Sequence, residues 1–207
     1  IGGYFELETN RGGEYHNDCI RLNSGRNCLE YIIRTREYSK IYLPYYFCDV
    51  LLEPMQKLNI EYSFYHIDSN FNPIIDFSVS SGEALFYINF FGIKDDVVQK
   101  LAQNYSNLII DNSQAFFAKR IHGVDTFYSP RKFFGVPDGG YLYADHVELN
   151  IEAQDVSLNR MNHLLKRIES GPEAGFEDYK INDASIMNQP IKNMSAITKA
   201  ILKSIDY

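Results

Sequence analysis

Thr126 to Tyr143 reads TFYSPRKFFGVPDGGYLY and holds two β-type runs separated by a glycine-containing turn. Ser-Pro-Arg-Lys follows the first run, and Asp-Gly-Gly leads into the second. A strand that reverses in this way would fix one amine, that of Lys132, at the end of a sheet. Its aromatic neighbours would favour a neutral, nucleophilic amine. On this stretch alone, however, a solvated loop lysine is the preferred interpretation, because most lysines lie in water.

Upstream of this stretch, β-type and helical patterns alternate along the chain. A short strand, Lys40–Leu43, ends at a proline, and Glu61–Ile67 alternates apolar and polar residues as a half-buried strand does. The continuous apolar runs Ala84–Asn89 and Asn107–Asp111 are typical of strands covered on both faces. The helices predicted between the strands lie over 23–37, 45–58 and 94–105. This order predicts an α/β fold with a mainly parallel sheet.

Ligands of such sheets bind at the carboxyl ends of the strands. We therefore expect the residues that follow four of the strands to line one crevice: Pro44–Phe47, Asn89, Asp111–Gln114 and Lys132. A carboxylate placed directly after a buried strand, like that of Asp111, is costly unless it meets a cation. The crevice is thus predicted to combine an acid with an amine.

The helix that begins at Asn23 or Ser24 opens with Asn-Ser-Gly-Arg. Free backbone N–H groups, the positive end of the helix dipole, a hydroxyl and the Arg26 guanidinium would converge there, as at an anion site. An ordinary N-cap beside a solvated arginine explains the same residues and is the preferred interpretation in isolation.

The composition excludes several classes of function. The 207-residue chain is 45% hydrophobic, as globular proteins are, and its net charge of −7 without a basic stripe argues against nucleic-acid binding. We predict neither a membrane span nor a signal peptide. Three cysteines, at positions 19, 28 and 48, and five scattered histidines have no metal-binding spacing, so no metal site and a reduced, cytoplasmic setting are predicted.

The two ends of the chain are less regular. Residues 1–22 are predicted to form an arm, with weak strand character at Tyr4–Leu7. Beyond Tyr143, helices are predicted over 157–169 and 194–205, on either side of the polar, loosely patterned stretch 174–193.

One ligand would use the crevice groups together, and that ligand is pyridoxal phosphate (PLP). Its aldehyde condenses with lysine, its protonated ring nitrogen pairs with an aspartate and its phosphate binds at a helix N-terminus. Lys132, Asp111 and the helix start offer these three contacts, and Tyr46 and Phe47 offer a flat surface for the ring. No glycine-rich dinucleotide or P-loop motif supports a nucleotide cofactor instead. A Cys–His nucleophilic pair is expected by chance in a chain of this length.

The runs NLIIDNSQAF (107–116) and FYSPRKFFGVPDGGYLY (127–143) resemble the DegT/DnrJ/StrS family of PLP-dependent sugar aminotransferases. The helix start NSGR (23–26) is similar to the family's phosphate-binding Ser-Gly-Thr segment. This resemblance covers about Asn23 to Tyr143. It implies the three-layer α/β/α large domain of the fold-type-I PLP-dependent transferases over 1–207, with a helical part at 151–207 and without the family's C-terminal small domain.

The resemblance also implies roles for individual residues. Lys132 would hold the cofactor covalently and transfer a proton, Asp111 would contact the ring nitrogen, and Gln114 would lie near the ring hydroxyl. The sequence departs from the family pattern at several of the remaining cofactor contacts, which are Ser24, Gly25, Arg26, Phe47, Cys48, Asn89 and Ser129. An arginine replaces the family threonine, an asparagine replaces a histidine, and the serine before the lysine is displaced by two positions.

The function implied is transfer of an amino group from an amino acid to a keto sugar, expected to be nucleotide-linked. A homodimer would carry it out in cell-surface polysaccharide or amino-sugar biosynthesis. Lys132 argues against the related dehydratases that lack this lysine. The alternative is a catalytically incomplete PLP-fold fragment or a regulatory or binding module. A third interpretation is an unrelated α/β domain with a solvated lysine.

Overall fold

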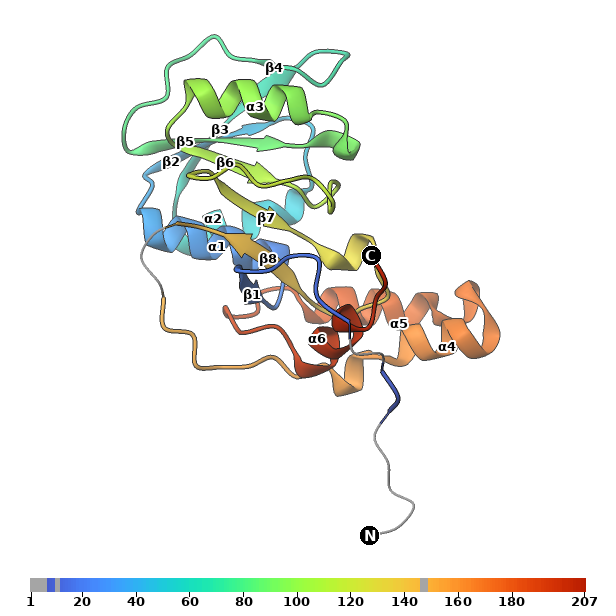
Figure 1. The fold of residues 1–207 in the computed structure, drawn as a ribbon. Coiled ribbons are helices and arrows are strands. Elements are labelled where there is room, and N and C mark those ends of the chain that lie inside the picture. Colours follow the sequence, from blue (N-terminus) through green and yellow to red (C-terminus); the bar gives the residue numbers. More distant parts are fainter. Residues whose placement is uncertain (1–6, 10–11, 146–148) are drawn as a thin grey trace.

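A computed structural model describes residues 7–9, 12–145 and 149–207 (Figure 1). Within these residues, eight strands form one sheet in the order β1-β8-β7-β6-β5-β2-β3-β4. Neighbours from β7 to β3 are parallel, whereas β8, β1 and β4 pair antiparallel with their neighbours. The strands are β1 Ile20–Leu22, β2 Lys40–Pro44, β3 Glu61–Ile67, β4 Pro73–Ile74, β5 Glu83–Ile88, β6 Leu108–Asp111, β7 Asp125–Tyr128 and β8 Gly140–Tyr143.

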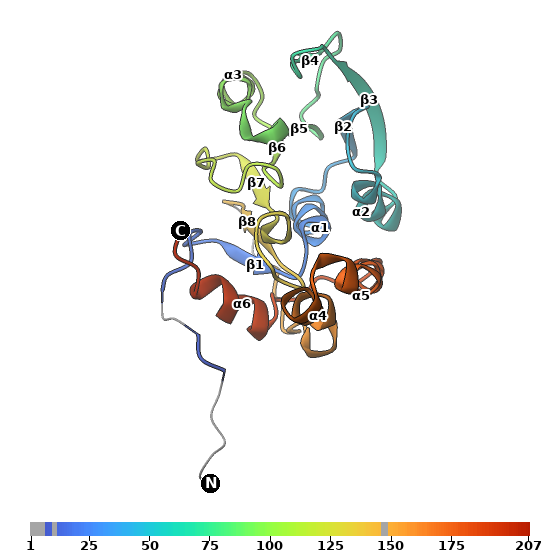
Figure 2. The same ribbon diagram turned by 90° about the vertical axis from the view of Figure 1, so that its right-hand side faces the viewer.

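Helices cover both faces of this sheet. Figure 2 shows α1 and α2 on one side of the central strands and α3 on the other, which makes three layers. The α-helices are α1 Gly25–Arg36, α2 Leu52–Leu58, α3 Asp95–Asn104, α4 Asn162–Ser170, α5 Pro172–Ser185 and α6 Ala196–Lys203. The α/β class, the layering and the mainly parallel mixed sheet predicted from the sequence are confirmed. None of the helices in the described residues is long and apolar enough to cross a membrane.

The central strands owe their continuous apolar sequences to this double covering. In β5, Ala84, Leu85, Phe86 and Tyr87 are fully buried, although successive side chains point to opposite faces. A second apolar cluster lies on the other side of β8, where Tyr141 packs with Met194 and Leu202 from the C-terminal region. The C-terminal helix α6 is therefore part of the core and not an appendage.

The segment before β1 differs from the predicted arm. Glu14 and His16 are buried, and Ile20–Leu22 forms an edge strand paired with β8. The His16 ring lies 2.8 Å from the Phe116 carbonyl through Nε2 and 3.1 Å from the Tyr143 hydroxyl through Nδ1. This polar segment can lie in the interior because its polar atoms form hydrogen bonds there. Most of the strand expected near residue 4 lies outside the described residues.

Two helical expectations need correction. The helix expected over 45–58 begins only at Leu52, after a 3-10 turn at Asp49–Leu51. The loosely patterned stretch after Pro172 forms the 14-residue helix α5. Its large apolar residues, among them Phe176 and Ile181, are exposed and do not share one buried face, so the helical period could not be seen. The helices predicted near both sides of it are α4 and α6.

Candidate active site at the carboxyl end of the sheet

The carboxyl ends of β6 and β7 border a cavity of about 250 Å³, whose other walls are the first turn of α1 and one side of α5. An adjoining cavity of about 210 Å³ is lined by Phe47 and Gln114. The structure brings together all the site residues predicted from the sequence except Asn89. Those that line the larger cavity are Ser24, Gly25, Arg26, Cys48, Asp111, Ser129 and Lys132.

The first turn of α1 presents backbone N–H groups to the larger cavity. Ser24 is the N-cap, and its Oγ accepts from the Asn27 N–H at 3.2 Å and donates to Asn27 Oδ1 at 2.6 Å. The N–H groups of Gly25 and Arg26 lie in the first turn, where no intrahelical acceptor exists, and the helix dipole adds positive potential. The Arg26 guanidinium instead pairs with Glu53 of α2 at 2.9 Å. Its charge is thus already balanced by a carboxylate.

Asp111 ends β6 and is only 5% exposed. The Ser113 N–H donates to its Oδ1 at 2.7 Å. Burial raises the pKa of Asp111, against the opposing effects of the Ser113 side chain and backbone and of the Lys132 charge. A buried carboxylate without an ion pair is costly, and a cation bound in the cavity would reduce this cost.

Lys132 lies at the end of a 3-10 turn, Pro130–Lys132, that directly follows β7. It lines both cavities, as Asp111 does, and in the described residues it forms no ion pair. Ser129, the N-cap of the same turn, also faces the larger cavity, and its hydroxyl has no hydrogen-bond partner in the described chain. A lysine amine and an uncommitted hydroxyl therefore lie beside the helix start.

The aromatic residues next to Lys132 do not enclose it, which corrects the expected apolar setting. Lys132 is exposed. Strand β7 directs Phe127 and Tyr128 into the interior, where both are fully buried. The two phenylalanines that follow the lysine pack against the Phe116 ring, with centroids 5.6 and 4.8 Å away. The aromatic residues before and after Lys132 therefore pack elsewhere and do not surround its amine.

Two predicted residues have other partners. The buried Asn89 amide donates to Asp95 Oδ1 at 2.7 Å and accepts from the Lys94 N–H at 3.1 Å, so it stabilises the start of α3. It does not line either cavity of the site. Gln114 does, although its Oε1 accepts from the Phe91 N–H at 2.9 Å.

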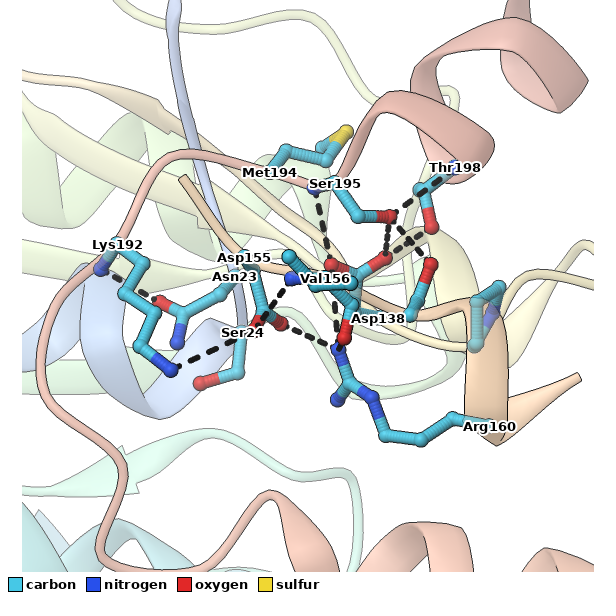
Figure 3. A network of polar contacts seen from close by, with 12 residues as sticks. Asn23, Ser24, Asp138, Asp155, Val156, Arg160, Lys192, Met194, Ser195 and Thr198 are labelled. Carbon is cyan, nitrogen blue, oxygen red and sulfur yellow. Dashed lines mark hydrogen bonds and ion pairs between the residues drawn. The ribbon is translucent and has the colours of Figure 1, made fainter. Parts of the chain in front are cut away.

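The Asp-Gly-Gly turn after Lys132 is held by a buried carboxylate (Figure 3). Asp138 is completely buried and accepts hydrogen bonds from the Ser195 N–H at 3.0 Å, from the Ser195 hydroxyl at 2.8 Å and from the Thr198 hydroxyl. Arg160 Nη2 lies 3.8 Å from Asp138 Oδ2. Since Ser195 is the N-cap of α6, this network joins the turn to the C-terminal helix.

The same turn also fixes the start of α1. The Gly139 N–H donates to the Asn23 carbonyl at 2.9 Å. A Cβ atom at Gly140 would lie 2.7 Å from both the Ser24 carbonyl oxygen and the Cys28 Sγ, so only glycine permits this approach. The helix start and the lysine-bearing segment are thereby held in one rigid arrangement.

Sequence reasoning did not identify several residues that line the larger cavity. Arg131 donates to Asp183 Oδ1 of α5 at 3.1 Å, and Tyr179 and Ile186 lie on the same wall. Arg131 could have been found from its position beside Lys132. The α5 residues carried no signal, because neither a motif nor an apolar period marks that helix.

Searches against protein-family models and curated proteins found no match. Solved structures do resemble this chain. The Helicobacter pylori PseC, an aminotransferase involved in the biosynthesis of pseudoaminic acid, is 14% identical over 63% of this chain and 40% of its own, with a TM-score of 0.49. S. venezuelae DesV in complex with a ketimine intermediate is 15% identical over 66% of this chain and 41% of its own, also with a TM-score of 0.49.

A third solved structure is the E. coli GDP-4-keto-6-deoxy-D-mannose-3-dehydratase with bound hydrated PLP. It is 18% identical over 62% of this chain and 39% of its own, with a TM-score of 0.48. This chain therefore spans about two fifths of the length of these proteins. At such low identities and TM-scores, the chemistry of the chain has to be argued from its own residues.

Proposed function

We propose that this chain is the PLP-binding large domain of an aminotransferase that transfers an amino group from an amino acid to a keto sugar, expected to be nucleotide-linked. The observation that carries the proposal is the convergence in one cavity of Lys132, Asp111 and the first turn of α1. These groups come from distant parts of the sequence and supply an amine, an acid and an anion site.

The residues present fit this cofactor. The N–H groups of Gly25 and Arg26, with the uncommitted Ser129 hydroxyl, offer donors for the phosphate. Among the described residues the buried Asp111 carboxylate has no ion-pair partner and is influenced only by the Lys132 charge, and a protonated ring nitrogen would supply a partner. When bound, PLP provides an electron sink that stabilises a carbanion next to the substrate nitrogen.

Each residue of the site would contribute a separate step. Lys132 would bind the cofactor covalently through Nζ and then, as a free amine, move a proton to or from the substrate carbon. Asp111 would hold the proton on the ring nitrogen, and the α1 start would fix the phosphate. The Asp138 turn would fix the position of the Lys132 amine relative to the start of α1.

A second copy of the chain would exclude water from this open site. The smaller cavity and a further cavity that shares Gln114 with it are bordered by exposed aromatic side chains. These are Tyr46, Phe91, Phe117 and Phe133. We therefore propose a homodimer that covers this rim, and sedimentation analysis should give the mass of two chains. A monomer at every concentration would contradict the proposal. All three cysteines are free thiols, in keeping with the cytoplasmic location that we propose.

The cofactor assignment can be tested by chemical trapping. The protein is mixed with PLP and reduced with borohydride, and the modified lysine is mapped by peptide mass spectrometry. We expect the adduct on Lys132 and none in the Lys132→Ala variant. Lys119→Ala is the matched control, since Lys119 is exposed and does not line the larger cavity. No adduct, or an adduct spread over other lysines, would refute the assignment.

The exposure of Lys132 favours one alternative, a PLP-fold module without catalysis, because reactive intermediates need protection from water. Absorbance changes on adding glutamate, glutamine or alanine to the loaded protein distinguish the two functions. Conversion of the cofactor to its pyridoxamine form by a donor supports the aminotransferase. Uptake of cofactor at Lys132 without conversion by any amino donor supports the module.

A further inference from the structure

A further cavity of about 500 Å³ is also bordered by Lys132 and lies between residues 131–136 and the α4–α5 hairpin. The two helices of this hairpin lie side by side at the edge of the fold (Figures 1 and 2). Gly175 of α5 makes their close packing possible, because a Cβ atom there would lie 2.4 Å from the His163 carbonyl oxygen. The cavity shares Arg131, Lys132 and Tyr179 with the proposed PLP cavity, but the helix start that we assign to the PLP phosphate does not line it.

The cavity lining is basic although the chain as a whole is acidic, with a net charge of −7. Arg131, Lys132, His163 and Arg167 contribute to it, and none of the described carboxylates does. Arg131 has one acidic partner, Asp183, at 3.1 Å. Arg167 and Lys132 have none among the described residues. Positive charge without a counter-charge in a concave site favours an anionic ligand.

His163 lies in the cavity wall and is 8% exposed. Burial and then the Arg131 charge lower the pKa of His163, while a hydrogen bond with the Arg160 backbone and the Asp178 charge raise it. An anion bound beside the ring would raise this pKa further, so His163 reports on what occupies the cavity.

The same cavity also has an apolar wall. The rings of Phe176 and Tyr179 on α5 are stacked, with centroids 6.4 Å apart and an interplanar angle of 20°, and both remain about half exposed. Both line the cavity. Such a surface accepts the flat or apolar part of a small molecule.

We propose that this cavity binds an organic phosphate, with its phosphate group at Arg131 and Arg167, beside His163, and its apolar part against Phe176 and Tyr179. Guanidinium groups bind phosphate oxygens in a two-pronged geometry, and Arg167 offers a positive charge that no described carboxylate balances. Because Lys132 borders the cavity, the far end of the ligand would reach the amine. Only this link to catalysis rests on the proposed function, whereas binding itself does not.

Phenyl phosphate is a suitable probe because it joins a phosphate to one flat ring. Calorimetric titration of the full chain without PLP should show saturable binding. Arg167→Gln should weaken it about tenfold or more, the usual effect of losing a charge-assisted hydrogen bond. Lys166→Gln is the matched control, since it removes the same charge from the same helix outside the cavity, where Lys166 pairs with Asp178 at 2.6 Å. That variant should bind like the unmodified protein.

The His163 ring gives a second readout. A bound dianion should raise the pKa of His163, measured from the pH dependence of its ring resonance by NMR with and without phenyl phosphate. Phenylacetate, which carries a single charge on the same ring system, should bind more weakly. Equal binding of the two compounds would contradict the assignment to phosphate.

The probe could instead occupy the first turn of α1, and Ser129→Ala distinguishes the two places. Binding that is lost in Ser129→Ala and kept in Arg167→Gln would overturn the proposal, as would the absence of saturable binding or an unchanged His163 pKa. An equal loss in Lys166→Gln would also overturn it, because the attraction would then be unspecific. None of these outcomes depends on trapping PLP at Lys132, so failure of this proposal and failure of the proposed function are distinguishable.

Discussion

Replacement of Asp138 by alanine tests how the lysine-bearing segment is held. The carboxylate is completely buried and accepts three hydrogen bonds from Ser195 and Thr198, with Arg160 at 3.8 Å. Alanine would leave these three donors without their acceptor, whereas Arg160 would keep its closer ion pair with Asp155 at 2.5 Å. Each buried donor left unsatisfied costs about 1–3 kcal/mol, and because these costs overlap we expect a total of about 3–5 kcal/mol.

Asp138→Asn separates the charge from the hydrogen bonds. Burial raises the pKa of Asp138 in spite of its donors, which means that the charge itself is costly to bury. The amide oxygen can keep part of the network, whereas the amide NH2 would face the donors from Ser195 and Thr198. We therefore expect a smaller loss, about 2 kcal/mol.

Urea unfolding followed by far-UV circular dichroism measures both losses, provided that the slope with denaturant is unchanged. Asp96→Ala is the control, because Asp96 is an exposed acid in the first turn of α3, and it should change stability by less than about 0.5 kcal/mol. A loss below about 1 kcal/mol in Asp138→Ala would refute the reasoning. It would show that water or rearranged side chains replace the carboxylate.

Three further results are expected. Burial lowers the pKa of His16 from 6.5 to about 4, so the unfolded chain binds more protons between these values and stability should fall as the pH drops through this window. The loss between pH 7 and 5 should be about 2 kcal/mol and absent in His16→Gln, and an identical pH dependence in both proteins would contradict it. Gly140→Ala should destabilise the fold by about 2 kcal/mol or more and weaken PLP uptake. The reason is that its Cβ would lie 2.7 Å from the Ser24 carbonyl oxygen and from Cys28 Sγ. Urea unfolding curves identical to those of the unmodified protein would exclude this clash. The Asp111→Asn variant should still form the borohydride-trapped PLP adduct at Lys132, but its amino-group transfer should be at least about a hundredfold slower. An unchanged transfer rate would show that residue 111 does not hold a proton on the ring nitrogen.

The fold could be predicted because its strands carry strong local signals. The β5 run is apolar on both faces, the start of α1 has a serine cap, and Asp111 ends a buried strand. The rule that ligands bind at strand carboxyl ends then predicted most of the residues that line the two candidate cavities, since parallel neighbours end at the same edge. These features depend on residues close together in the sequence.

The features that could not be predicted depend on distant partners. His16 is buried because the Phe116 carbonyl and the Tyr143 hydroxyl meet its ring. The Arg26 charge is taken up by Glu53. The exposure of Lys132 depends on where the following phenylalanines pack. No local pattern contains this information, because each contact forms only when the whole sheet is assembled.

The Asp138 network changes which part of the chain should be regarded as the site. The motifs that resemble known enzymes lie between Asn23 and Tyr143, yet the turn after Lys132 is held by Ser195 and Thr198. The same turn donates a hydrogen bond to the Asn23 carbonyl, so a movement of α6 would displace both the start of α1 and the lysine-bearing segment. Ser195 and Thr198 are therefore positioning residues of the proposed cofactor site, although no local sequence signal suggests it.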